Sequence, residues 1–123
     1  MDFVTAVKSV LTNYAGFSGR AARAEYWYYA LFVFVAMLVL SFVDYAMGTV
    51  NEDGYGLLNG VFALATLCPS LAVGFRRMHD IGKSAWWLLI GLIPFVGFLI
   101  LIYFFVQPSQ PGPNQYGAHP YGM

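Results

Sequence analysis

Charged residues are scarce in this sequence, and their scarcity decides the class of protein. Lys, Arg, Asp and Glu together make up 10% of the 123 residues, whereas hydrophobic residues make up 59%. Soluble domains carry about 25% charged residues, so this composition predicts an integral membrane protein. The formal net charge is zero. A chain without net positive charge has no long-range attraction to nucleic acid, and we expect no nucleic-acid partner.

Cysteine and the common catalytic motifs are also missing or nearly so. The single cysteine, Cys68, has no second cysteine to pair with, which excludes an internal disulfide and a cysteine-based zinc site. No phosphate-binding GxxxxGK[ST] loop, GxSxG pattern or HExxH pattern occurs. We therefore predict no metal, no cofactor and no catalytic residue, and a protein that is not an enzyme.

The N-terminus lacks the continuous apolar core and the cleavage site of a signal peptide. Residues 1–15 instead place apolar side chains at helical spacing, including Phe3, Val7, Val10 and Tyr14. This pattern is typical of an amphipathic helix that is too short and too polar to span a bilayer. We expect it to lie in the membrane interface, and packing on the helices of a second copy is the alternative.

Three long apolar runs follow, over residues 26–47, 57–75 and 86–106. Each has about the 20 residues that a helix needs to cross the hydrocarbon core. The third run contains Pro94 between two glycines, where the chain could turn back. Its 21 residues cannot cross twice, so we predict one kinked helix there.

The predicted fold is therefore a single all-α integral membrane domain covering residues 1–123. It has three transmembrane helices, preceded by the amphipathic interfacial helix and followed by an irregular tail over residues 107–123, which is rich in Pro, Gly, Gln and Tyr.

Every Lys and Arg falls on one side of the membrane in this arrangement. These residues are Lys8, Arg20, Arg23, Arg76, Arg77 and Lys83. The loop of residues 48–56, with Glu52 and Asp53, falls on the other side together with the tail. The positive-inside rule then predicts a cytoplasmic N-terminus and a periplasmic C-terminus.

Two segments at the basic side combine charge with aromatic residues. Tyr26 and Trp27 begin the first span, and Trp86 and Trp87 begin the third, where aromatic side chains anchor helices at the interface. Asp80 lies near the C-terminus of the second span, where the helix dipole disfavours an anion. Asp80 should therefore have a cationic partner, and Glu25 could neutralise another cation. The candidate cations for Asp80 are Arg20, Arg23, Arg76 and Arg77.

Basic residues beside two helix starts suggest a phosphate site on this face. The candidate ligand is the headgroup of an anionic membrane lipid, and a membrane-protein partner or a second copy of the chain is the other kind of partner. The site residues that we predict are Arg20, Arg23, Arg76, Arg77 and Lys83. Two alternatives stay open. The basic residues could serve only topology and internal ion pairs, or His79 with Asp80 could act as acid and base on a lipid headgroup.

Three segments resemble the signatures of the domain of unknown function 805 family of small bacterial inner-membrane proteins. They are residues 17–27 (FSGRAARAEYW), 76–87 (RRMHDIGKSAWW) and 108–117 (PSQPGPNQYG). The resemblance covers nearly the whole chain, in order. It implies a multi-pass protein of the bacterial inner membrane with no established activity.

Overall fold

A computed structural model of the chain describes residues 2–52 and 54–120. Within these ranges the regular elements are five helices: α1 (Phe3–Thr12), α2 (Arg23–Met47), α3 (Leu57–Asp80), the 3-10 helix η1 (Ala85–Leu92) and α4 (Val96–Phe105). The predicted all-α class is confirmed. Residue 1 of the predicted interfacial helix, Asp53 of the acidic loop and residues 121–123 of the tail lie outside the described residues.

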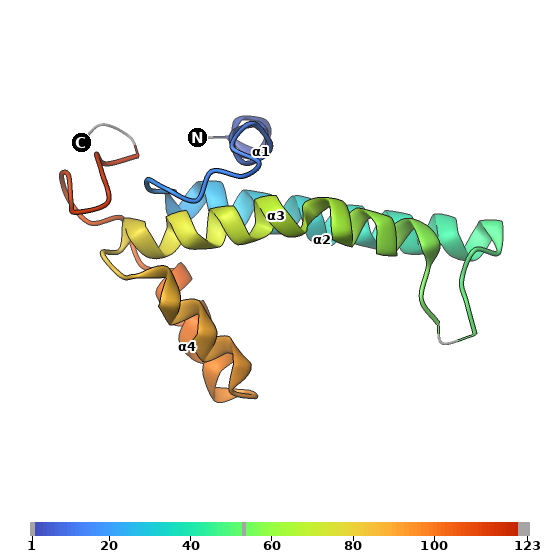
Figure 1. The fold of residues 1–123 in the computed structure, drawn as a ribbon. Coiled ribbons are helices and arrows are strands. Elements are labelled where there is room, and N and C mark those ends of the chain that lie inside the picture. The colour runs from blue at the N-terminus through green and yellow to red at the C-terminus, as the bar shows by residue number, and fades with distance from the viewer. Residues whose placement is uncertain (1, 53, 121–123) are drawn as a thin grey trace.

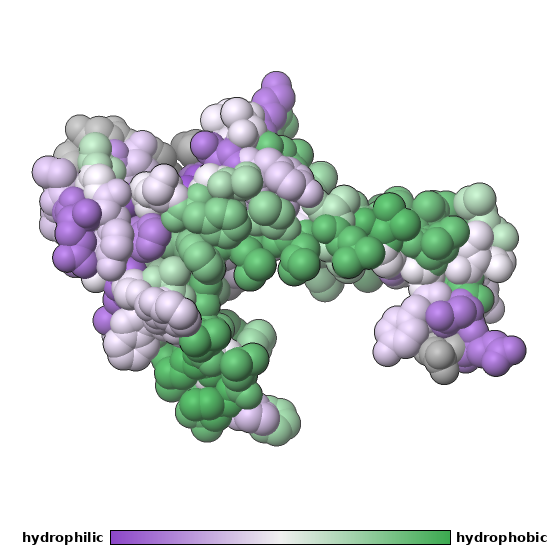
Figure 2. Space-filling model, in the orientation of Figure 1, coloured by the Kyte–Doolittle hydropathy of each residue, from purple (hydrophilic) through white to green (hydrophobic). Residues whose placement is uncertain are grey.

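The helices α2 and α3 form a long antiparallel pair that gives the molecule its length (Figure 1). Both are long and apolar enough to cross a membrane. Many of their apolar side chains are exposed: Phe34 on α2 is 63% exposed and Leu64 on α3 is 75% exposed. Apolar residues cover the length of the pair, and hydrophilic residues gather at its two ends (Figure 2). This distribution is that of helices surrounded by hydrocarbon.

Helix α1 crosses the α2–α3 pair near the start of α2 (Figure 1). Asp2 begins it, since its side chain accepts a hydrogen bond from the Thr5 backbone N–H at 2.7 Å. Hydrogen bonds from Thr5 lower the pKa of Asp2. Val7 and Val10 are buried, while Val4 and Leu11 are exposed. One edge of the amphipathic stripe thus packs on the bundle and the other edge stays free.

At the opposite end, Asp44 of α2 caps the start of α3. Its carboxylate accepts the backbone N–H groups of Leu58 and Asn59 at 2.9 and 3.0 Å, which have no partner inside their own helix. A Cβ on Gly56 would lie 2.0 Å from Asp44 Oδ2, so only glycine fits beside this cap. The sequence prediction did not include this role for Asp44.

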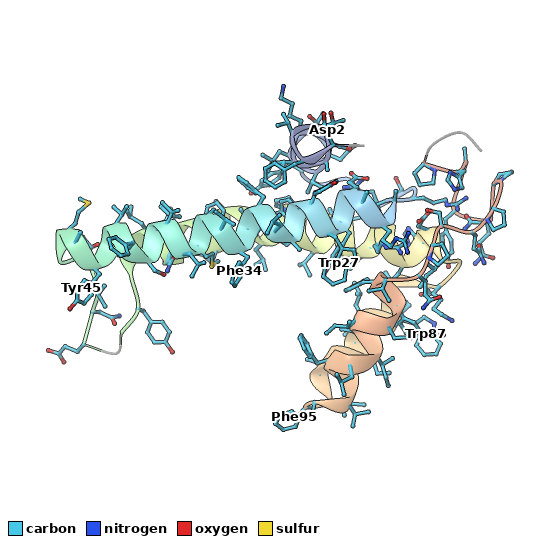
Figure 3. All side chains as sticks on the ribbon, turned by 180° about the vertical axis from the view of Figure 1, so that it is seen from behind. Asp2, Trp27, Phe34, Tyr45, Trp87 and Phe95 are labelled. Carbon is cyan, nitrogen blue, oxygen red and sulfur yellow. The ribbon has the colours of Figure 1, made fainter. Side chains whose placement is uncertain are left out.

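The prediction of a single helix over residues 86–106 is wrong. The chain forms η1, turns at Pro94 and Phe95, and returns as α4 (Figure 1). We call these two helices the apolar hairpin. Phe95 has a positive φ of 63° and marks the tip (Figure 3). A Cβ on Gly97 would lie 1.8 Å from the Ile90 carbonyl oxygen, so the two arms approach this closely only because residue 97 is glycine.

The hairpin also overturns the predicted position of the tail. Because α4 returns towards the end of α3, residues 107–120 lie beside Arg20 and Asp80 instead of at the far end of the molecule (Figure 1). The expectation that the basic loop and the tail lie at opposite ends is therefore wrong. Helix α1 and residues 107–120 thus lie towards the same end of the α2–α3 pair.

Candidate functional site

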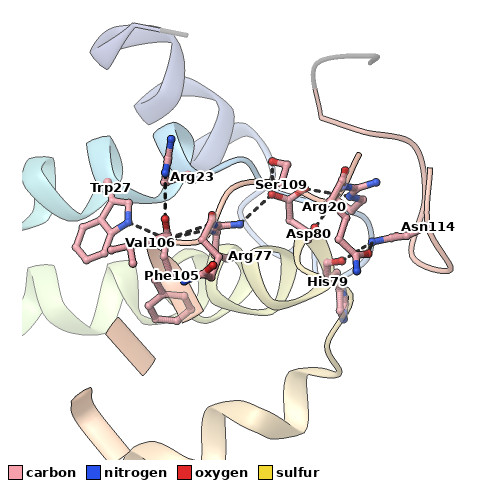
Figure 4. A network of polar contacts seen from close by, with 12 residues as sticks. Arg20, Arg23, Trp27, Arg77, His79, Asp80, Phe105, Val106, Ser109 and Asn114 are labelled. Atoms are coloured by element: carbon pink, nitrogen blue, oxygen red, sulfur yellow. Dashed lines mark hydrogen bonds and ion pairs between the residues drawn. The ribbon is translucent and has the colours of Figure 1, made fainter. Parts of the chain in front are cut away.

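A buried network of arginines joins the end of α3, the approach to α2 and the tail (Figure 4). At its centre is Asp80, the last residue of α3. Arg20 Nε donates to Asp80 Oδ1 at 3.0 Å, and Arg77 Nη1 donates to Asp80 Oδ2 at 2.9 Å; all three side chains are 0% exposed. The Ser109 hydroxyl from the tail also donates to Oδ2. We call Arg20, Arg77 and Asp80 the arginine clasp.

The clasp holds the tail through backbone carbonyl groups. Arg20 donates from Nη1 to Gly112 and from Nη2 to Gln110, both at 2.7 Å. Arg77 donates from Nε and Nη2 to the Phe105 carbonyl and from Nη2 to that of Gln107. These last two carbonyls lie at the C-terminus of α4, where helical partners are missing and the helix dipole favours a cation. The arginines therefore cap the second arm of the hairpin.

Two residues of α2 add to this capping from the side. Arg23 Nη1 donates to the Val106 carbonyl at 3.1 Å, and Trp27 Nε1 donates to the Phe105 carbonyl at 2.9 Å (Figure 4). Trp27 is thus an anchor for α4 in addition to being an aromatic residue at a helix start. This role requires the hairpin, and the sequence alone gave no sign of it.

A second buried ion pair lies under α1. Arg76 Nη1 donates to Glu25 Oε1 at 3.0 Å, and the Ser9 hydroxyl of α1 donates to the same oxygen at 2.7 Å. Arg76 Nε and Nη2 are buried and have no hydrogen-bond partner among the described residues. This pair ties α1, α2 and α3 together.

The two buried groups together contain more guanidinium groups than carboxylates. Three guanidinium groups, those of Arg20, Arg76 and Arg77, meet two carboxylates, those of Glu25 and Asp80. Backbone carbonyls solvate part of the surplus. Lys8, Arg23 and Lys83 lie around these groups, so every Lys and Arg of the chain is gathered at this end of the bundle.

The remaining basic side chains point outwards. Lys8 and Arg23 are exposed. Lys83 is half-buried, with its Nζ 5.1 Å from the ring centroid of Trp87 and 5.1 Å from that of Phe104. A lysine over aromatic faces is held at the surface with its charge still accessible. These three residues, which we call the outer basic set, differ from the buried arginines in being able to meet a ligand.

His79 and Asp80 are adjacent in the sequence, but their side chains have different hydrogen-bond partners. The carboxylate of Asp80 is occupied by the clasp, while His79 Nδ1 contacts the Gly19 carbonyl oxygen at 2.9 Å. A carbonyl can only accept, so Nδ1 carries a proton and Nε2 is the free nitrogen. The ring stacks on Tyr116 with centroids 4.2 Å apart. The structure does not bring His79 and Asp80 together as an acid and base pair.

The predicted site residues therefore divide into two groups. Arg20, Arg76 and Arg77 pair with the two carboxylates that the sequence singled out, whereas Arg23 and Lys83 remain at the surface. Among the residues that the structure describes, no three His, Cys, Asp or Glu side chains gather as metal ligands. Of the predicted interface anchors, Trp86 is 78% exposed and Tyr26 packs against Phe105.

Sequence comparisons identify relatives that match along most of the chain. The profile of a family described as Protein of unknown function (DUF805) matches residues 14–118. Inner membrane protein YhaH of Escherichia coli K12 is 44% identical over 111 residues, which are 90% of this chain and 92% of that protein. Inner membrane protein YhaI of the same strain is 40% identical over 112 residues, or 91% and 92% of the two chains. No solved structure matches.

Proposed function

This chain belongs to the family described as Protein of unknown function (DUF805), and on that basis we propose that it is a non-enzymatic multi-pass protein of the bacterial inner membrane that binds anionic lipid headgroups at its cytoplasmic face. The names of the relatives support the location. The outer basic set supports the binding, because its charges are not neutralised by the ion pairs that hold the fold together.

We propose that α2 and α3 cross the bilayer and that the apolar hairpin enters it from the cytoplasmic side. With 25 and 24 residues, α2 and α3 are long enough to cross, since a helix rises about 1.5 Å per residue and the hydrocarbon core is about 30 Å thick. The 10 residues of α4 rise only about 15 Å, which is half of that core. The hairpin would therefore stay in one leaflet and return its end to the cytoplasmic side.

The composition of the hairpin fits such an insertion. Residues 85–106 contain no charged side chain, and Phe95 at the tip is 85% exposed. At the turn, Ile93 and Gly97 donate their backbone N–H groups to carbonyls within the hairpin, and Pro94 has no N–H to satisfy. Each N–H group paired in this way lowers the cost of placing the turn in hydrocarbon.

The distribution of charge supports a cytoplasmic position for both chain ends. All six Lys and Arg residues lie in α1, at or just before the start of α2, near the C-terminus of α3 or just before η1. Glu52 lies in the loop at the other end of the α2–α3 pair. The positive-inside rule then assigns the clasp, the outer basic set and the tail to the cytoplasm.

Lipid retention tests the proposed binding. In native mass spectrometry of the purified protein, replacing Lys8, Arg23 and Lys83 by Gln should lower the retention of phosphatidylglycerol and cardiolipin relative to phosphatidylcholine. A basic residue near an anionic surface contributes about 1 kcal/mol, so we expect a loss of about fivefold for each charge removed.

The matched control keeps the charges and changes the side chains: Lys8→Arg, Arg23→Lys and Lys83→Arg. This variant should retain anionic lipids as the parent does. Equal retention by the Gln variant and the control would rule out headgroup binding by the outer basic set.

A further inference from the structure

A groove of about 720 Å³ runs between α3 and η1. We propose that it holds one acyl chain of a membrane glycerophospholipid, with the lipid phosphate lying against His79, Ser84 and Tyr116. The inference goes beyond headgroup binding by the outer basic set, because the groove uses none of those three residues. Its volume falls within the roughly 300–1,000 Å³ that ligand sites in proteins span.

The walls of the groove suit a hydrocarbon chain. Leu71 and Phe75 lie one turn apart on α3, and Leu88, Leu89 and Leu92 line the groove from η1. None of the described residues that line it is acidic or basic apart from His79. The hairpin diverges from α3 (Figure 1), and the surfaces of both are largely apolar in Figure 2. A flexible chain can enter the groove from the bilayer without crossing a polar barrier.

Polar groups occur at one end of the groove only. His79, in the last turn of α3, lines this end, and the hydrogen bond from its Nδ1 to the Gly19 carbonyl fixes the orientation of the ring. Stacking on Tyr116 from the tail holds the ring on its face as well. His79 Nε2 is therefore a positioned nitrogen that bonds to none of the described residues, and in the imidazolium form it is a donor for an anionic oxygen.

Two hydroxyl groups accompany it. The Ser84 hydroxyl oxygen accepts from the Trp86 backbone N–H at 3.2 Å, which leaves its own hydrogen free to donate. The side chain of Tyr116 also lines the groove. A phosphate diester, which has acceptor oxygens and no donor, matches this set of donors.

The position of the polar end is also right for a phosphate. Ser84 and Trp86 lie next to Lys83 and Trp87, at the end of the bundle where all the basic residues gather. In the proposed arrangement this level is the cytoplasmic headgroup region, where lipid phosphates lie. The polar end would then meet the phosphate while the apolar walls meet the chain.

Photolabelling of the full-length protein in phosphatidylglycerol vesicles tests the site. The probe is phosphatidylglycerol with a diazirine in one acyl chain. We expect cross-links in residues 85–92 and 71–75. Leu89→Trp, which fills the groove, should abolish them, whereas Leu38→Trp on the exposed face of α2 should not. Tyr116→Phe keeps the ring stack and removes one hydroxyl, so labelling should fall about 2- to 10-fold.

Three results would overturn the proposal. They are cross-links spread evenly over α2 and α3, undiminished labelling of Leu89→Trp, and equal labelling by a diacylglycerol probe that lacks the phosphate. These readouts are independent of the outer basic set. A failure of headgroup selectivity in the Gln variant would therefore leave the groove result intact, and the reverse also holds.

Discussion

At the scale of single residues, Asp80 has the most consequential environment in the protein. Its carboxylate accepts from two guanidinium groups and one hydroxyl, which come from three separate parts of the chain. Taking these ions out of water is costly, and the cost is offset only while every partner is present. Loss of the carboxylate would remove the anion that two buried guanidinium groups both contact.

We therefore predict that Asp80→Asn lowers the free energy of unfolding by about 3–5 kcal/mol, the range for breaking a buried ion pair. Thermal unfolding of the purified protein in detergent measures the loss. Arg23→Gln is the matched control, because Arg23 is exposed and gives one hydrogen bond to the Val106 carbonyl. A loss for Asp80→Asn no greater than that for Arg23→Gln would show that the clasp does not hold the fold.

The sequence predicted part of this environment. A carboxylate near a helix C-terminus is unfavourable alone, and this was enough to expect a cationic partner for Asp80. Which arginine would reach it could not be predicted, because Arg20 is 60 residues away along the chain. The carbonyl acceptors in the tail also could not be predicted from the sequence, because every residue has a backbone carbonyl whatever its side chain.

At the scale of elements, the hairpin is the feature that sequence reasoning missed. Residues 86–106 have the length and hydropathy of one spanning helix, and a helical hairpin of the same composition gives the same pattern. The glycines and the proline were visible in the sequence. Their effect depends on contacts made only in the closed hairpin, above all the approach of Gly97 to the Ile90 carbonyl. The end of α2 and the start of α3, by contrast, coincide with the limits of the apolar runs, whereas α2 begins at Arg23 and α3 continues to Asp80.

Gly97→Ala tests whether that approach holds the hairpin closed. A methyl group 1.8 Å from a backbone oxygen cannot be accommodated without separating the arms. We expect a loss of about 1–3 kcal/mol in the free energy of unfolding, as is usual for overpacking. The measurement is again thermal unfolding in detergent.

Gly60→Ala in α3 serves as the control, because a Cβ there meets no atom within 4 Å. Alanine favours a helix over glycine by up to about 1 kcal/mol, so this variant should be as stable as the parent or more so. If both alanine variants behaved alike, the close contact between the arms would have no energetic role.

At the scale of the whole molecule, the two buried ion-pair groups and the hairpin together hold α1, the end of α4 and the tail at one end of the α2–α3 pair. The clasp fixes the tail and the end of α4 beside the start of α2, and the Arg76–Glu25 pair fixes α1 over the same end. The molecule is thereby polarised: one end gathers all the basic residues, α1 and residues 107–120, and the other end carries the polar loop with Glu52. Between them lie an apolar pair of helices and a short apolar arm (Figure 2). The composition alone was enough to predict a membrane protein, but not this one-sided arrangement.

The central claim is that the hairpin returns the tail to the side of the N-terminus, and cysteine accessibility tests it most directly. In a Cys68→Ala background, single cysteines replace Ser18, Glu52 or Gln115, all of which are exposed. A membrane-impermeant maleimide is then applied to right-side-out and inverted inner-membrane vesicles. We predict that positions 18 and 115 are labelled only in inverted vesicles and position 52 only in right-side-out vesicles. Labelling of position 115 together with position 52 would contradict the account and restore three full crossings.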